Sequence, residues 1–318
     1  MNILGIETSC DETAAAVVKD GRTILSNVVV SSLREHSRYG GIIPEIASRR
    51  QLTCISAVVE EALHRAKVNE QQLQAVAVTG YPGLIGSLLV GKSFARAYAA
   101  RLGKPLTEID HIQAHLYANF LRDPDDRTPA PELPAIGLVV SGGHTSLYHI
   151  RNPRQFRLIG QTRDDAAGEA FDKVARVLAL GYPGGPAIEK KAAEAKKGAI
   201  KFTCAKMPGT LDFSYSGIKT AVLYHKNEHA GDDDYAVAEV AFAFQDSVTD
   251  NLADKALDAC RHHQCRTLLV GGGVAANKSL RHKLIERGKI GGIKVHFPPM
   301  PLCLDNAAMI AGLAMHQA

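Results

Sequence analysis

The strongest constraint on the fold is a run of three short apolar segments at the amino end of the chain, followed by longer amphipathic ones. Strands are predicted at 2–6, 14–18 and 23–30, because each is a short apolar run between turn residues. A helix is predicted after them, where the apolar residues of 46–63 fall on one stripe. Further strand and helix patterns alternate up to about residue 109. This order is typical of a mixed sheet covered by helices.

The same plan begins again after the polar segment 123–134, which holds four prolines and is the best linker candidate. Its three predicted strands span 135–140, 145–150 and 155–159. We therefore expect an internal duplication. In the second half, helices are predicted up to Leu180 and over 186–197, 217–224 and 236–263.

We expect three parts in the chain. Residues 1–122 form an amino-terminal lobe, residues 123–134 a linker, and residues 135–318 a carboxy-terminal lobe. The last helix of the second lobe is expected to pack back on the first. The fold class is α/β with mixed sheets flanked by helices.

Two histidines four residues apart, His111 and His115, follow a short apolar segment that ends at Ile109. On a helix two such positions differ by only about 40° in azimuth, so both imidazoles can bind one metal ion. A third hard ligand, Asp305, lies far along the chain. Two histidines and one carboxylate with open positions suit Fe(II), and they also suit zinc. An exposed histidine pair that binds no metal is the alternative interpretation.

The histidine pair does not have the pattern of a zinc peptidase. Such a site needs a glutamate directly after its first histidine, where this chain has Ile112. Gln113 lies about 200° around the helix from His111, so it cannot join the ligand face. A metal here would hold a substrate rather than cleave a peptide.

Composition and charge exclude several classes of protein. The net charge, 37 minus 33 or +4, permits a nucleic-acid partner without demonstrating one. The six cysteines have no disulfide framework and no zinc-binding spacing, so we expect free thiols in a reducing compartment. No apolar run approaches the roughly 18 residues needed to span a bilayer, and no signal peptide is recognisable. We expect a soluble, cytoplasmic protein without a membrane partner.

Residues 86–93 match the phosphate-loop pattern G-x-x-x-x-G-K-[ST] letter for letter. Such a loop must be irregular backbone with its N–H groups turned inward. Residues 88–90, however, are apolar and continue the stripe of a helix predicted over 84–102. We therefore predict that this match is coincidental and that the phosphate cradle is Ser141-Gly142-Gly143, where glycine lets the backbone approach an anion.

A second glycine turn follows the strand predicted at 267–270 and leads into a helix that begins near Asn277. A strand, a glycine turn and a helix amino terminus together form a platform for an anion or a nucleotide, because free N–H groups point outward there. A plain tight turn is the alternative interpretation.

Seven motifs spread along the whole chain are long enough to be specific. They are E-T-S-C-D-E-T at 7–13, Y-G-G-I-I-P-E-I-A-S-R at 39–49, V-S-G-G-H-T at 140–145, D-D-A-A-G-E-A-F-D-K at 164–173, Y-P-G-G-P at 182–186, D-F-S-Y-S-G-I-K-T at 212–220 and D-N-A-A-M-I at 305–310. Together they resemble the bacterial tRNA N6-adenosine threonylcarbamoyltransferases, formerly described as sialoglycoprotein endopeptidases. That family is part of the actin-like ATPase and sugar-kinase superfamily, so the resemblance implies its two-lobed, duplicated ribonuclease-H-like fold.

The resemblance also implies the residues of the site. The metal ligands fall on His111, His115 and Asp305. The substrate-binding positions fall on Val139, Val140, Ser141, Gly142, Gly143, Asp172, Gly185, Glu189 and Asn277. We take Asp11 and Glu12 as the carboxylates beside the attacking amine, the alternative being a site that needs no base beyond the phosphate.

Some residues depart from the pattern of the family. Gln113 stands in place of a glutamate, Leu304 in place of a threonine and Gln51 in place of a histidine, and Tyr81 interrupts a T-x-G-P-G motif. Gln113 should not affect metal binding, because it lies on the other side of the helix from the two histidines. Tyr81 and Leu304 bear on the geometry of the substrate.

The resemblance implies a metal-assisted reaction at a site between two lobes. The threonylcarbamoyl group passes from threonylcarbamoyl-adenylate to N6 of the adenosine next to the anticodon, in tRNAs that read codons beginning with A. The implied macromolecular partners are tRNA, a scaffold paralogue and a small P-loop ATPase. Two alternatives are a small-molecule kinase of the same superfamily, which would not need the histidine pair, and a non-catalytic scaffold, which would lack that pair and the long second lobe.

Overall fold

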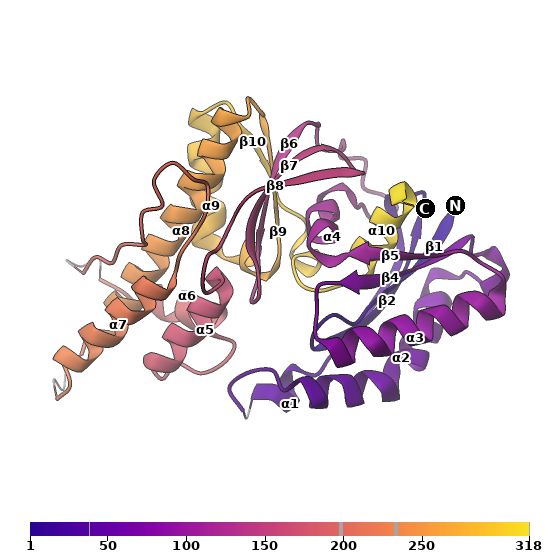
Figure 1. The fold of residues 1–318 in the computed structure, drawn as a ribbon, viewed down its shortest axis with the longest axis horizontal. Coiled ribbons are helices and arrows are strands. Elements are labelled where there is room, and N and C mark those ends of the chain that lie inside the picture. Colours follow the sequence, from indigo (N-terminus) through magenta and orange to yellow (C-terminus); the bar gives the residue numbers. More distant parts are fainter. Residues whose placement is uncertain (38, 197–199, 232–234, 318) are drawn as a thin grey trace. The chain divides into compact units, whose positions relative to one another are not determined.

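The computed structural model describes residues 1–37, 39–196, 200–231 and 235–317 of the chain (Figure 1). The chain divides into two compact units. Unit 1 consists of Met1–Pro131, Pro153–Gln155 and Pro298–Ala318, and unit 2 consists of Glu132–Asn152 and Phe156–Phe297. Residues 298–318, which we assigned to the second lobe, therefore belong to unit 1. No helix in the described ranges is both long and apolar enough to cross a membrane.

The sheet of unit 1 has five strands in the order β3-β2-β1-β4-β5. They are β1 (Asn2–Glu7), β2 (Glu12–Lys19), β3 (Thr23–Ser31), β4 (Ala75–Tyr81) and β5 (Leu106–Asp110). Strand β2 runs antiparallel to its neighbours β1 and β3, whereas β4 and β5 run parallel to β1. The sequence prediction of three strands in a row at the amino end is confirmed.

Helices cover both faces of this sheet. They are α1 (Leu33–Ser37), α2 (Pro44–Ala66), η1 (Glu70–Gln72), α3 (Ile85–Leu102), α4 (His111–Tyr117), η2 (Ala118–Phe120), η4 (Met300–Leu302) and α10 (Ala307–Gln317). Helices α2 and α3 lie side by side on one face, and α4 and α10 lie on the other (Figure 1). Ile55, Val58 and Val59 of α2 are buried against the sheet, and each such side chain contributes about 1.5–3 kcal/mol to folding.

Unit 2 repeats the sheet of unit 1. Its strands are β6 (Ala135–Val140), β7 (Thr145–Asn152), β8 (Gln155–Gln161), β9 (Thr267–Gly271) and β10 (Lys294–His296). Their order, β10-β9-β6-β7-β8, is the order of unit 1 read from the other edge. Strand β7 is antiparallel to β6, and β9 and β10 are parallel to it, as in unit 1. The predicted duplication is therefore present in the topology.

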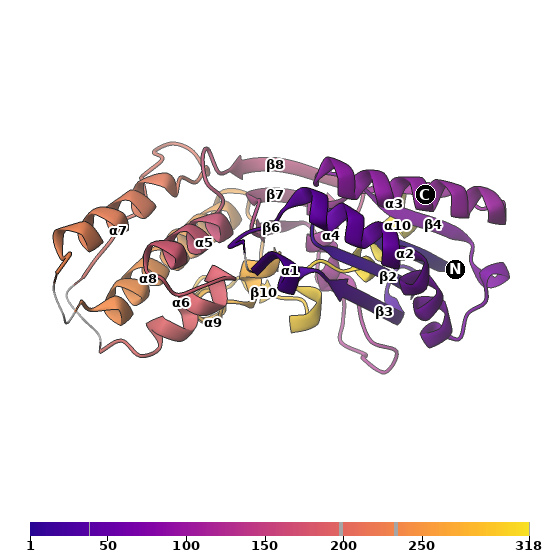
Figure 2. The same cartoon turned by 90° about the horizontal axis from the view of Figure 1, so that it is seen from below.

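The helices of unit 2 are α5 (Ala167–Val177), α6 (Gly184–Ala192), α7 (Ser216–Glu228), α8 (Val237–His262), η3 (Gly273–Ala276) and α9 (Lys278–Ile290). Helix α8 packs between α6 and α9 (Figure 2). Helix α5 ends before the predicted Leu180, because Ala179 takes a left-handed φ of 56°. Helix α6 ends at Ala192, and the predicted end of this helix, Lys197, lies outside the described residues.

Candidate active site

Helix α4 presents both histidines on one face, as their spacing predicted. The helix begins at His111, where the Asp110 carboxylate accepts hydrogen bonds from the backbone N–H groups of Ile112 (2.8 Å) and Gln113 (3.1 Å). This cap fixes the start of the helix and therefore the direction of each side chain. The Gln113 amide donates to the other oxygen of Asp110 at 3.2 Å, so it takes no part in the histidine pair.

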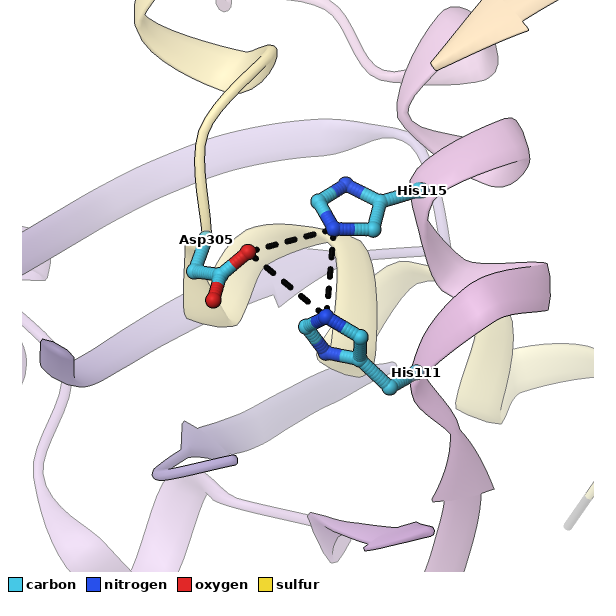
Figure 3. Close-up of side chains that lie close together, drawn as sticks. All are labelled: His111, His115 and Asp305. Atoms are coloured by element: carbon cyan, nitrogen blue, oxygen red, sulfur yellow. Dashed lines mark hydrogen bonds and ion pairs between the residues drawn. The ribbon is translucent and has the colours of Figure 1, made fainter. Parts of the chain in front are cut away.

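Three donor atoms from distant parts of unit 1 form a triangle (Figure 3). The Nε2 atoms of His111 and His115 lie 3.2 Å apart, and Asp305 Oδ1 lies 3.1 Å from His115 Nε2 and 3.6 Å from His111 Nε2. Metal–ligand bonds of about 2.0–2.2 Å would separate neighbouring ligand atoms by roughly 3.0–3.5 Å. Both histidines are buried. The three residues therefore fit one divalent metal ion.

The other ring nitrogen of His111 contacts a buried carboxylate. His111 Nδ1 lies 2.9 Å from Glu7 Oε2. Burial lowers the pKa of His111, but the negative charges of Glu7 and Asp305 raise it more, and the net result is a pKa of about 9. A metal must therefore displace a proton from this ring at neutral pH.

Asp11 and Glu12, the predicted catalytic carboxylates, lie at the turn between β1 and β2. The carbonyl of Asp11 accepts a hydrogen bond from the Ser32 hydroxyl at 2.7 Å, and Glu12 accepts one from the Ser31 hydroxyl at 3.1 Å. Burial and the charges of Asp11 and Asp305 raise the pKa of Glu12 to about 10. Glu12 consequently holds a proton at neutral pH and can donate a hydrogen bond. A cation bound to Asp305 would lower this pKa.

In unit 2, the turn from Ser141 to Gly143 is closed by its neighbour His144. The Ser141 N–H donates to the His144 carbonyl at 2.8 Å, and the His144 N–H donates to the Ser141 hydroxyl at 3.1 Å. A Cβ atom added to Gly142 or to Gly143 would meet nothing within 4 Å. The space over this backbone is therefore open to a ligand.

Val139 and Val140 are fully buried in β6. They can contact a ligand only through their backbone, because their side chains face the protein interior. The Val140 carbonyl packs against Gly272, where a Cβ would come within 2.4 Å of it. The first and last predicted turns of unit 2 are thus in contact at this point.

Asp172 holds the amino end of helix α6. Its carboxylate accepts a hydrogen bond from the Gly184 N–H at 2.7 Å, and burial raises its pKa. At the next residue, Gly185, an added Cβ would meet no atom within 4 Å. The amino end of this helix is thus both fixed and accessible, as an anion site requires.

Glu189 and Asn277 meet at the amino end of helix α9. Glu189 accepts a hydrogen bond from the Lys278 N–H at 2.6 Å, and Asn277 caps the helix by accepting one from the Leu280 N–H at 3.0 Å. The Asn277 amide also donates to Gln245 at 2.9 Å. Both polar atoms of the Asn277 side chain are therefore engaged within the protein.

Comparisons with known proteins identify the family of this chain. The family model described as TsaD, tRNA N6-adenosine threonylcarbamoyltransferase, matches residues 23–312. The chain belongs to this family. A relative so named from Syntrophomonas wolfei is 48% identical over 98% of this chain and 91% of its own length, and one from Clostridium perfringens is 49% identical with the same coverage.

Solved structures support the fold at low sequence identity. HypF of T. kodakarensis has a TM-score of 0.65 at 13% identity and covers 99% of this chain and 48% of its own. Component A of the (R)-2-hydroxyglutaryl-CoA dehydratase of Acidaminococcus fermentans has a TM-score of 0.56 at 14% identity, covering 100% and 98%. These similarities and the duplicated sheets confirm the actin-like ATPase fold predicted from the sequence.

Gln51, where the resemblance described above implied a histidine, has a structural role. The Gln51 amide donates to the carbonyls of Cys10 (2.9 Å) and Glu12 (3.0 Å) and reaches that of Thr8 at 3.5 Å. This role of Gln51 was not predicted from the sequence. A signal was present, because a polar residue at the i+4 position of an apolar helix stripe is unusual.

Two of the other departures noted in the sequence, Tyr81 and Leu304, lie on the surface of unit 1. Tyr81 is 57% exposed at the end of β4, and Leu304, directly before Asp305, is also 57% exposed. Neither side chain is buried beside the donor triangle. Their replacement by the family's residues would therefore leave the packing of the metal donors unchanged.

The phosphate-loop match at 86–93 lies in helix α3, as predicted. Its Lys92 lies 2.7 Å from the Glu108 carboxylate, and a Cβ on Gly91 would come within 2.1 Å of the Thr8 hydroxyl. Gly91 therefore allows α3 to pack closely against Thr8, and Lys92 forms an ion pair with Glu108. One part of the prediction was wrong, because Leu89 is 64% exposed and does not continue the buried stripe.

Proposed function

We propose that this chain transfers the threonylcarbamoyl group from threonylcarbamoyl-adenylate to N6 of the adenosine next to the anticodon, in tRNAs that read codons beginning with A. The observation that carries the proposal is the donor triangle of His111, His115 and Asp305 in a member of this family. Three protein ligands leave coordination positions open for a substrate. We propose Fe(II) as the metal, with zinc as the second candidate.

A bound divalent metal would neutralise charge on the adenylate phosphate and so favour departure of AMP. The residues of the chain supply the rest. In unit 2, the backbone of the Gly142–Gly143 turn and Gly185 at the amino end of α6 provide N–H groups for the adenylate. In unit 1, Asp11 accepts the proton of the attacking amine, or that proton passes to the departing phosphate. The carbon–nitrogen bond forms as the bond from the carbamoyl carbon to the phosphate oxygen breaks.

The test is mass spectrometry of tRNA nucleosides from a strain depleted of its own enzyme. Complementation with this chain should restore threonylcarbamoyladenosine, and the double variant His111→Ala, His115→Ala should not. Elemental analysis of the purified double variant should show loss of the metal, while circular dichroism shows an intact fold. Unchanged metal content in the double variant would refute the metal centre.

We also propose that the chain is inactive without partner proteins. We expect the chain and these partners to act in the cytoplasm. Large apolar side chains are exposed on the adjacent helices α2 and α3: Leu52 (70%), Ile85 (87%) and Leu89 (64%). We assign this surface to the scaffold paralogue, with the small P-loop ATPase joining that complex. The pure chain with threonine, bicarbonate, ATP and tRNA should yield no product, and Leu89→Glu should weaken co-purification of the paralogue. Product formation by the chain alone would contradict the requirement.

A further inference from the structure

Glu7 is a carboxylate with no solvent exposure at the end of strand β1. Its Oε2 atom lies 2.9 Å from His111 Nδ1 and accepts a hydrogen bond from the Thr79 hydroxyl at 2.5 Å. Its Oε1 atom accepts the backbone N–H of Ser9. Burying a charge is costly unless it is hydrogen-bonded, and these bonds provide the compensation. One of them reaches across 104 positions of sequence to a metal donor.

We propose that Glu7 is a positioning residue that sets the orientation and the tautomer of His111 for metal binding. This inference rests on the metal centre of the proposed function. An ionised carboxylate offers only lone pairs, so the ring nitrogen that faces it must carry the hydrogen. In a neutral imidazole the opposite nitrogen, Nε2, then has a free lone pair. That atom is the one directed at His115 and Asp305.

The geometry excludes Glu7 as a metal ligand itself. It contacts the Nδ1 edge of the His111 ring, whereas the donor triangle is built on the Nε2 edge. Among the described residues, the group of donor atoms within 4.8 Å of one another at this place contains only His111, His115 and Asp305. Metal-binding histidines commonly donate their second N–H to a carboxylate in this way.

Charge balance points in the same direction. A divalent cation with two neutral histidines and Asp305 would carry one net positive charge. The carboxylate of Glu7, on the far side of His111, is one of the acidic groups around this cluster, with Asp11 and Asp110, and it is the one in direct contact with a metal-donor ring. Buried charges are stabilised when they are balanced nearby, so Glu7 should strengthen the binding of a dication as well as orient one ligand.

A purely structural role makes a different prediction. The bonds from Ser9 and Thr79 hold the end of β1 and its turn, and their loss alone would lower the melting temperature without changing metal affinity. Metal affinity therefore separates the two roles. Thr79→Val is a matched control, because it removes a bond to Glu7 but leaves the contact with His111 in place.

The experiment is calorimetric titration of Zn²⁺ into the full chain after removal of bound metal by a chelator. Glu7→Gln should bind Zn²⁺ about 10–100-fold more weakly than the wild type, because the amide presents an N–H to Nδ1 and moves the ring hydrogen to Nε2. Thr79→Val should stay within threefold of the wild type. The visible absorption of bound Co²⁺ should change in Glu7→Gln and not in Thr79→Val.

The outcomes separate this inference from the metal centre itself. Wild-type protein that binds no Zn²⁺ would overturn the metal centre and the role of Glu7 together. Wild-type protein that binds Zn²⁺ no more tightly than folded Glu7→Gln would overturn the role of Glu7 alone. Should Glu7→Gln fail to fold, Glu7→Asp decides the matter: it keeps the charge but shortens the side chain, so weaker binding is expected and unchanged binding refutes the inference.

Discussion

The turns after the first strand of each unit occupy the same place in the duplicated plan but have opposite character. The β1–β2 turn of unit 1 is packed on several sides. Gln51 bonds its carbonyls, and added Cβ atoms on Gly83 and Gly91 would collide with Ser9 and Thr8. The β6–β7 turn of unit 2 is packed at its base, where a Cβ on Gly168 would come within 2.5 Å of the Ser141 carbonyl. Its two glycines are open, because Cβ atoms on Gly142 and Gly143 would meet nothing within 4 Å.

This contrast shows how one backbone plan supports two kinds of chemistry. In unit 1 the turn carries acids and hydroxyl groups, and the surrounding helices hold those side chains in place beside the histidines. In unit 2 the turn carries glycines, and we propose that the backbone N–H groups of Gly142 and Gly143 contact the ligand, since that of Ser141 donates to the His144 carbonyl. A packed turn positions side chains, whereas an open turn presents its backbone.

The largest effect is expected from a methyl group placed under the packed turn. Gly91→Ala should lower the free energy of unfolding by about 1–3 kcal/mol, as overpacking does, because its Cβ would approach the Thr8 hydroxyl to 2.1 Å. Gly217→Ala, in helix α7, has open space and should gain up to about 1 kcal/mol. Urea unfolding measures both. A tolerated Gly91→Ala would mean that the unit 1 turn is not tightly packed.

The open turn should tolerate a side chain structurally but not functionally. Gly143→Val is expected to keep the melting temperature of the wild type and to weaken AMP binding at least tenfold, which is about 1.4 kcal/mol. The side chain would fill the space that the ligand needs. Calorimetry with AMP tests this. Unchanged affinity in a folded variant would place the nucleotide away from this turn.

The pH dependence of metal binding tests the charges around the packed turn. The pKa of His111 is about 9 in the fold and about 6.5 in an unfolded chain. The metal competes with this proton, so metal affinity should rise up to about tenfold per pH unit between pH 7 and 8.5. The metal-free protein should lose stability over the same interval, because the fold binds the proton more tightly. A flat profile of Zn²⁺ affinity would contradict the effect of Glu7 and Asp305.

The smallest effect is expected at the phosphate-loop match. Lys92→Ala should leave AMP affinity within about threefold, well below the 1.4 kcal/mol of a tenfold change, because Lys92 of helix α3 is paired with Glu108 of strand β5. If Lys92→Ala weakened AMP binding more than Gly143→Val, the assignments of the two segments would be reversed.

The sequence predicted most of the elements because their periodicity is local. The i, i+4 spacing placed His111 and His115 on one helix face, and apolar residues spaced along the chain located the strands of both units. The exposure of Leu89 was not predictable in this way. Residues 84–90 are apolar around much of the helix, so periodicity identified a helix but not the stripe that faces the sheet.

The contacts that complete the site depend on long-range packing. Glu7 was visible as the polar end of an apolar strand and the first residue of the 7–13 motif, but nothing in its neighbours indicates the bond to His111. The same holds for Gln51, whose three carbonyl partners lie about forty residues away in the turn. Local patterns predict elements, whereas the partners of buried polar groups follow from the tertiary fold.

The split composition of unit 1 has a consequence for biosynthesis. Helix α10 packs on β1 so closely that a Cβ on Gly5 would come within 2.4 Å of the Ala307 carbonyl, and Asp305 directly precedes that helix. A ribosome therefore delivers the third metal donor only after it has translated all of unit 2. The nascent chain has both histidines long before it can close the triangle, so a metal ion bound by all three donors marks a polypeptide whose translation has passed residue 305.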